Sequence, residues 1–246
     1  MRQLWLFIPF LSLVLNAAEP SQWGENVSGV VTKFHTDKKE IALTFDACGG
    51  SAKSSQFDKT LIDFLIQNKV PATLFINARW IDSNPELFAR LSSDPLFEIG
   101  NHGTAHRPLS VDGKSVYNIA GTASPEEVAA EIEGNSLKIE KLTGKRPLFF
   151  RSGTAYYDEE AVRIAHAHGV EIAGFSIIAD EGATLSAPEV AKRIKNARSG
   201  DIIIAHMNHP ESGTGKGVAE AVNALIEAGF GFVRLGDVKE RLIRIP

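Results

Sequence analysis

The feature that most constrains the fold of this chain is a regular alternation of short apolar runs with segments of helical periodicity, which begins near Lys39. We expect strands at the apolar runs 41–45, 72–76, 97–99, 147–150, 170–178, 201–205 and 230–235. Helices are predicted at 57–68, 85–91, 124–142, 158–168, 186–197, 217–228 and 236–242. Strands that alternate with helices favour a parallel sheet. The predicted fold is therefore α/β, a distorted parallel (β/α) barrel with about seven strands.

A polar segment at 110–123 interrupts this alternation and is rich in Gly, Ser, Thr and Asn. Loops of this length in compact domains are usually functional or mobile, so we expect a surface loop beside the functional site. The next helix is predicted to begin at Ser124, because a serine cap, a proline in the first turn and Glu127 three residues later form a capping signal.

The first 18 residues have the layout of a secretory signal peptide. Arg2 precedes an apolar run at 4–15, which is shorter than the roughly 20 residues that a membrane-spanning helix needs. Asn16 or Leu15 stands where a small residue is preferred for cleavage, so an uncleaved anchor is the alternative. We predict a signal peptide at 1–18, an N-terminal extension at 19–38 and a catalytic barrel at 39–246. The mature protein is then periplasmic or secreted and has no stable membrane span.

Composition narrows the classes of partner. The 246 residues carry a formal net charge of −4, and no cluster of Lys and Arg forms a basic patch. This argues against a nucleic-acid partner and is compatible with a neutral polymer or a small polar substrate. The single cysteine, Cys48, excludes an intramolecular disulfide. The sequence indicates no particular protein partner.

Chemically active side chains follow the predicted strands. Asp46, His102, Arg151 and His206 each stand at the end of an apolar run. In a parallel barrel, the chemistry lies at the carboxyl ends of the strands, so we expect these side chains to lie close together.

His102 and His106 are four residues apart, and on a helical turn two such imidazoles leave the same face and can bind one metal ion. A capping or core role is the alternative for the pair. With a metal-activated water, Asp46 is a candidate base and His206 a candidate acid. Arg151 could orient the Asp46 carboxylate, although an ordinary salt bridge at the barrel rim is the alternative.

These residues give the chain a resemblance to the polysaccharide deacetylase family (carbohydrate esterase family four), which includes chitin and peptidoglycan N-acetylglucosamine deacetylases and xylan esterases. The matching segments are Thr44-Phe45-Asp46, His102 with His106, Phe150-Arg151, and Ile204 with His206. The resemblance implies that Asp46 is the base, that the two histidines are metal ligands, that Arg151 holds the base, and that His206 is the acid. The motif that tunes the acid is only loosely present, with Asp180 as its candidate.

One departure concerns the metal. The family has a second aspartate, a metal ligand, where this chain has Ala47. Asp46 itself, a Cys48 thiolate, or Asn101 or His209 could replace the missing ligand, and a buried, unreactive Cys48 is the alternative. We expect a divalent ion, with zinc the most plausible.

The resemblance implies removal of acetyl groups from N-acetylated sugars of an extracytoplasmic polysaccharide such as peptidoglycan or chitin. A backbone N–H in the turn that begins at Ser152 could stabilise the oxyanion, and Ile204 could line a niche for the acetyl methyl. Ser152, Tyr156 and His209 are further candidates for substrate binding. The alternatives are a metal-independent hydrolase of a small amide or cyclic ureide, and a sugar-binding protein without activity.

Overall fold

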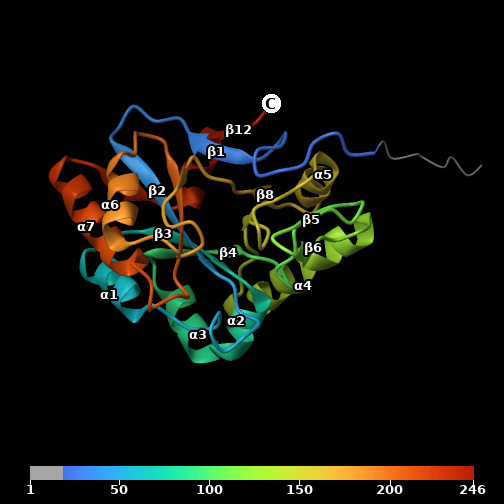
Figure 1. Cartoon of the computed structure of the whole chain (residues 1–246), viewed down its shortest axis with the longest axis horizontal. Helices are drawn as coiled ribbons and strands as arrows, with labels where there is room; N and C mark the ends of the chain where they lie inside the picture. Colours follow the sequence, from blue (N-terminus) through green and yellow to red (C-terminus); the bar gives the residue numbers. More distant parts are fainter. Residues whose placement is uncertain (1–18) are drawn as a thin grey trace, which may run out of the picture.

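The computed structural model describes residues 19–246, so the predicted signal peptide at 1–18 lies outside the described residues (Figure 1). In this part of the chain, no helix combines the length and the apolar character that crossing a membrane requires.

Parallel strands form the main sheet, and their order along it is β8, β7, β4, β3, β2, β10, β9, with β11 pairing on β2. These strands are β2 (Glu40–Ala47), β3 (Ala72–Ile76), β4 (Phe97–Asn101), β7 (Phe149–Phe150), β8 (Glu171–Ile172), β9 (Ile177–Ile178), β10 (Ile202–His206) and β11 (Gly231–Val233). The predicted α/β architecture with a curled parallel sheet is confirmed.

Helices cover the outside of the sheet, with α1, α6 and α7 together on one side and α4 and α5 on the other (Figure 1). They are α1 (Lys59–Gln67), α2 (Ala78–Ser83), α3 (Pro85–Ser93), α4 (Pro125–Thr143), α5 (Glu159–Ala167), α6 (Ala187–Lys195) and α7 (Thr214–Glu227), followed by the 3-10 helix η1 (Leu235–Arg241). The start of α4 is as predicted, because the Ser124 hydroxyl accepts a hydrogen bond from the Glu127 amide at 3.3 Å.

Strand β2 lies in the middle of the sheet, and all eight of its residues are buried. A continuous buried run of this kind is typical of a parallel strand that is covered on both faces. Ile41, Leu43, Phe45 and Ala47 belong to the core between the sheet and the helices. Side chains alternate between the faces of a strand, so Thr44 and Asp46 point to the other face, into the barrel.

The single strand predicted at 170–178 is wrong, because the structure breaks it into two strands at opposite edges of the sheet. Glu171–Ile172 (β8) pairs with β7, whereas Ile177–Ile178 (β9) pairs with β10. Among residues 19–246, β8 and β9 do not pair with each other, so the barrel has a seam at 173–176. The apolar pattern did not distinguish one buried strand from two short ones, because Ala173 and Gly174 fit either.

The segment 19–38 lies against this seam and contains a strand that the sequence did not predict. Strand β1 (Val31–Phe34) pairs antiparallel with β12 (Leu242–Arg244). β1 also bridges to Ala173, which follows β8 at the seam, and to Asp201, which directly precedes β10. The N-terminal segment therefore packs into the barrel body.

Two further predictions are corrected. The expected loop at 110–123 contains a small hairpin, β5 (Ser115–Val116) and β6 (Ile119–Ala120), in which Tyr117 and Asn118 both have positive φ. Positive φ at both central residues is the signature of a tight hairpin turn. The expected closing helix at 236–242 is the 3-10 helix η1, and its end is taken up by β12.

Candidate functional site

Asp46 and Arg151 form a buried ion pair at the carboxyl ends of β2 and β7. One guanidinium nitrogen of Arg151 lies 2.7 Å from Asp46 Oδ1 and 2.9 Å from the Thr44 hydroxyl. Asp46 Oδ2 takes no part in this bond and lies 3.7 Å from His102 Nε2. Arg151 therefore fixes one oxygen of the carboxylate and leaves the other facing the two histidines.

The rest of the Arg151 guanidinium is held by the seam of the barrel. Its Nε and Nη2 donate to the carbonyls of Ala173 at 2.9 Å and Gly174 at 3.1 Å. The ring of Phe75 stacks 4.2 Å from the guanidinium carbon. A buried cation needs its donors satisfied, and the broken strand supplies carbonyls that a continuous ladder would have used. The break between β8 and β9 thus helps to position Asp46, because its carbonyls hold Arg151.

His206 and Asp180 form a second pair at the end of β10. Asp180 Oδ1 lies 3.0 Å from His206 Nδ1, and Asp180 Oδ2 accepts from the His206 amide at 2.8 Å and from the Thr214 hydroxyl at 2.9 Å. Burial on its own lowers the pKa of His206, but the charge and hydrogen bond of Asp180 outweigh it, so that the pKa is raised. His206 keeps its proton more readily than an isolated histidine and has Nε2 free for chemistry.

His102 and His106 do converge, but the prediction that they share a helical turn is wrong. His102 directly follows β4, and His106 lies in the loop beyond it with φ of 63°. The two ring centroids are 4.9 Å apart at an angle of 90°. A left-handed residue in the loop therefore brings the rings together, where helical periodicity was expected to do so.

This loop is held by buried polar side chains that the sequence analysis missed. The Glu131 carboxylate on α4 accepts from the Ala105 amide, at 3.0 and 2.9 Å, and from the Arg107 amide at 3.1 Å. The Asn77 amide group donates to the carbonyls of His102 and Gly103 at 2.9 and 2.8 Å. The signal in the sequence was a charged residue at 131, on the helix face whose other buried members include Val128 and Ile132.

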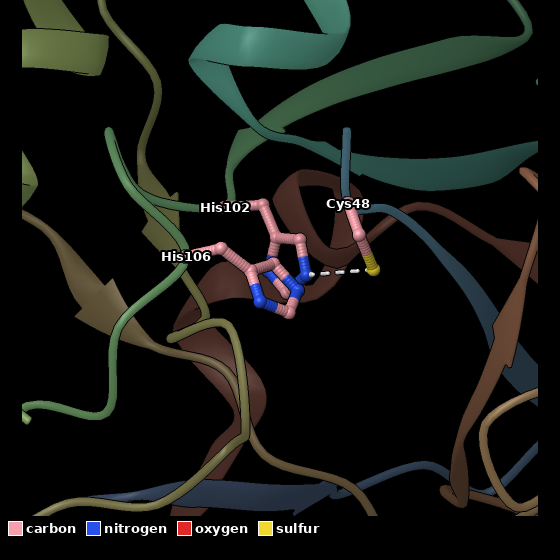
Figure 2. Close-up of side chains that lie close together, drawn as sticks. All are labelled: Cys48, His102 and His106. Atoms are coloured by element: carbon pink, nitrogen blue, oxygen red, sulfur yellow. Dashed lines mark hydrogen bonds between the residues drawn. The ribbon is translucent and has the colours of Figure 1, made fainter. Parts of the chain in front are cut away.

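Cys48, His102 and His106 form a set of potential metal ligands, and Figure 2 shows the three side chains pointing toward one another. One ligand atom from each lies within 4.8 Å of the other two. His102 Nδ1 lies 2.9 Å from the Arg151 carbonyl and must donate to it, which leaves an unprotonated Nε2 facing the cluster. His106 Nε2 is buried without a hydrogen-bond partner among residues 19–246.

The pKa shifts of His102 and His106 also favour a metal site. Burial lowers the pKa of both His102 and His106. The pKa of His106 falls well below the ordinary value, because positive charge on His102 and Arg79 lowers it further. Metal ligation requires the neutral imidazole. The donor set fits a divalent metal. It consists of the unpartnered His106 Nε2, the unprotonated His102 Nε2 and the Cys48 thiol.

One member of this cluster, His106, lines a cavity of about 630 Å³. Asp46, His106, Asp180 and His206 line it, together with the exposed aromatic Tyr117 on the hairpin. The structure therefore brings the expected base, the expected acid and one of the two expected metal-binding histidines to one cavity, with His102 buried beside His106.

The four expected substrate-binding residues are placed differently. Ile204 lines the cavity, but Ser152 is fully buried, its amide donating to the Tyr157 hydroxyl at 3.0 Å and its own hydroxyl to the Tyr156 carbonyl at 3.2 Å. Tyr156 stacks between Trp23 and Tyr117, with ring centroids 5.7 Å from each. The ring of His209 lies 6.3 Å from that of His206, beside Glu211. Gly153 and Thr154 line the cavity next to Ser152.

Comparison with known proteins agrees with this geometry. The family model described as polysaccharide deacetylase matches residues 33–173. The chain belongs to the polysaccharide deacetylase family. Curated relatives of the chain are peptidoglycan deacetylases, which hydrolyse carbon–nitrogen bonds outside peptides, so the predicted family and enzyme class are confirmed.

Two curated relatives span most of the chain. A peptidoglycan-N-acetylglucosamine deacetylase of Bacillus cereus is 27% identical over 216 residues, which cover 86% of this chain and 93% of the relative. The peptidoglycan-N-acetylmuramic acid deacetylase PdaA of Bacillus subtilis is 22% identical over 242 residues, covering 93% and 84%. Among solved structures, a family-four pseudoenzyme of Bacillus anthracis matches with a TM-score of 0.71 and 19% identity, over 86% of this chain and 69% of that one. That structure supports the fold alone.

Proposed function

We propose that this deacetylase removes acetyl groups from N-acetylated amino sugars of an extracytoplasmic polysaccharide, with peptidoglycan as the leading candidate and a divalent metal as cofactor. The observation that carries the proposal is one cavity lined by Asp46, which Arg151 holds, by the His206–Asp180 pair, and by His106, which belongs to the cluster with Cys48 and His102. A protein that only binds sugar has no need for an oriented carboxylate, a tuned histidine and free metal ligands together.

In the proposed reaction, water adds to the acetamide carbonyl and the carbon–nitrogen bond then breaks to give acetate and an amine. A divalent metal held by the cluster would supply Lewis acidity, which acidifies water and polarises the carbonyl. Asp46 Oδ2, free of Arg151, takes the proton from the attacking water. His206 Nε2 gives a proton to the nitrogen as it leaves, while Asp180 holds the other side of the ring.

The oxyanion needs donors that are not already used. The amides of Ser152 and Ala155 donate within the turn, to Tyr157 Oη and to the Ser152 carbonyl. The amides of Gly153 and Thr154 have no hydrogen-bond partner among residues 19–246, and both residues line the cavity. We therefore assign the oxyanion contact to one of these two amides, with Ile204 facing the acetyl methyl.

The substrate assignment is supported by the activities of the two relatives and by the exposed aromatic residue at the cavity. Tyr117 is 66% exposed at the tip of the hairpin and contacts Tyr156 edge to face. The tight turn of the hairpin, in which Tyr117 has positive φ, holds this ring at the cavity. An exposed ring beside the cavity suits a sugar that continues beyond the acetylated unit.

Metal dependence is testable directly. Wild-type protein is expected to hold close to one divalent ion per chain, and removal of the ion by a chelator should abolish acetate release from N-acetylglucosamine oligomers. His106→Ala should lose the ion because it removes one of the converging ligand atoms. Elemental analysis and an acetate assay measure both effects. His168→Ala, which removes a histidine paired with Glu133 outside the cavity, is the matched control and should keep the metal.

The outcomes of that experiment separate the alternatives. Undiminished acetate release in chelator would favour the metal-independent amide hydrolase. Tight oligosaccharide binding with no acetate release from the metal-loaded protein would favour the inactive sugar-binding protein.

The proposed location is also open to test. The charged start and apolar run at 4–15 predict export and removal of about the first 18 residues. Cell fractionation and N-terminal sequencing should find the protein outside the cytoplasm with a start near Glu19. Exported protein that still begins at Met1 would show that the segment stays attached.

A further inference from the structure

We propose that Cys48 is the third protein ligand of the metal, one position after the residue where the family has its carboxylate ligand. The inference rests on the metal-dependent function proposed above. It assigns a thiolate to a centre that in the family resemblance has two histidines and an aspartate.

The direction of the β2 side chains excludes position 47 and favours position 48. Ala47 is fully buried in the core between the sheet and the helices, together with Phe45. Asp46 points the opposite way, into the cavity. Because side chains alternate along an extended chain, the residue two beyond Asp46 returns to the cavity side. Figure 2 shows Cys48 directed at the two imidazoles.

Distances within the cluster are close to those of a metal site. Cys48 Sγ lies 3.9 Å from His102 Nε2. With ordinary zinc–sulfur and zinc–nitrogen bonds and a tetrahedral angle, a thiolate and an imidazole nitrogen are separated by about 3.6 Å. The second, independent observation is His106 Nε2, which is buried without a hydrogen-bond partner in the described chain and belongs to the same cluster.

Asn101 and His209 contact other groups, and Asp46 is assigned as the base. The side-chain nitrogen of Asn101 donates to the Ile132 carbonyl and the Ser136 hydroxyl, both at 2.8 Å. Its side-chain oxygen accepts from the backbone amide of Gly103 and from the side-chain amide of Asn135. His209 contacts Glu211 through Nδ1 and Asn208 through Nε2. Asp46 has one oxygen bound to Arg151.

A thiolate in this place has two chemical consequences. Asp46 is not needed as a ligand, so its second oxygen remains available as the base. Soft sulfur ligands favour zinc and cobalt, whereas carboxylates suit magnesium and manganese. The centre is therefore expected to prefer zinc or cobalt strongly over manganese.

The test uses the metal itself and does not depend on catalysis. The full-length mature protein is stripped with chelator and titrated with Co²⁺, and a cobalt–thiolate bond is expected to give a near-ultraviolet charge-transfer absorption. Cys48→Ala should abolish that absorption. It should also weaken metal binding by more than the roughly 10–100-fold that is lost when a residue that only orients a metal ligand is removed. Cys48→Asp, the matched variant, should bind metal without the absorption and shift the preference toward manganese.

Thiol reactivity gives a second measurement on the same protein. Cys48 is the only cysteine, so alkylation reports on it alone. Stoichiometric zinc is expected to protect the thiol in wild type, and His106→Ala should remove that protection. Cobalt bound without charge-transfer absorption, with unchanged affinity in Cys48→Ala, would overturn the assignment and leave the metal-dependent function standing. Failure of wild type to bind any divalent ion would overturn both.

Discussion

Asp46→Asn is expected to lower turnover at least on the order of a hundredfold, in the range usual for a general base. The asparagine keeps the shape of the side chain and can still accept from Arg151, but it cannot take a proton from water. Acetate release per folded molecule is the measurement. Metal content should stay at the wild-type level, because the proposed ligands are Cys48, His102 and His106. Near wild-type turnover in folded Asp46→Asn would remove Asp46 from the mechanism.

The same substitution carries a stability cost that must be separated from the kinetic effect. Arg151 is fully buried, and Asp46 is its counter-ion. Breaking a buried ion pair from one side typically costs about 3–5 kcal/mol. The carbonyls of Ala173 and Gly174 continue to accept from the guanidinium, so the fold is expected to survive at low temperature. Thermal unfolding measured beside the assay gives the folded fraction.

His206→Ala is expected to lower turnover by a similar factor, on the order of a hundredfold or more, because the leaving nitrogen loses its proton donor. The effect should be smaller for a substrate whose leaving group needs no proton, such as an activated aryl acetate. Comparison of the two substrates therefore isolates the role of the acid. An equal loss on both would mean that His206 acts elsewhere in the reaction.

The pH dependence of the rate tests the same assignment through Asp180. The acid must be protonated, and Asp180 raises the pKa of His206 against the opposing effect of burial. The alkaline limb of the wild-type profile should therefore lie above the ordinary histidine value of about 6.5. Asp180→Asn removes the charge and leaves the burial of His206, so the pKa of His206 should fall and the limb should move to lower pH. Thr214→Val is the control, because it removes one hydrogen bond to Asp180 but keeps the charge.

Much of the site could be predicted from sequence, because the carboxyl ends of neighbouring parallel strands lie at the same end of the barrel. Asp46, His102 and Arg151 were each recognisable as polar residues that end a buried run, and the topology brings such residues together whatever the details of the loops. The pairing of Asp180 with His206 was also expected, although the surrounding motif is only loosely present.

Other features have no local pattern. The left-handed conformation of His106 depends on contacts from Asn77 and Glu131, which are remote in sequence. The break at 173–176 is stabilised by Arg151, which donates to the carbonyls of Ala173 and Gly174 in place of a neighbouring strand. Hydrophobic periodicity predicts which residues are buried, but it does not predict which distant group forms a hydrogen bond with a buried polar atom.

The pairing of β1 with β12 has a consequence for the order of folding. Val31 is matched with Arg244, more than 200 residues further along the chain. Contacts between such distant segments form slowly, because a long loop must close before they give any stabilisation. β1 also bridges to Ala173 at the seam and to Asp201 just before β10, so the barrel wall beside Arg151 is completed only when β1 and β12 pair. The barrel can close only once the residues of β12 are available for pairing, which is compatible with the export proposed above.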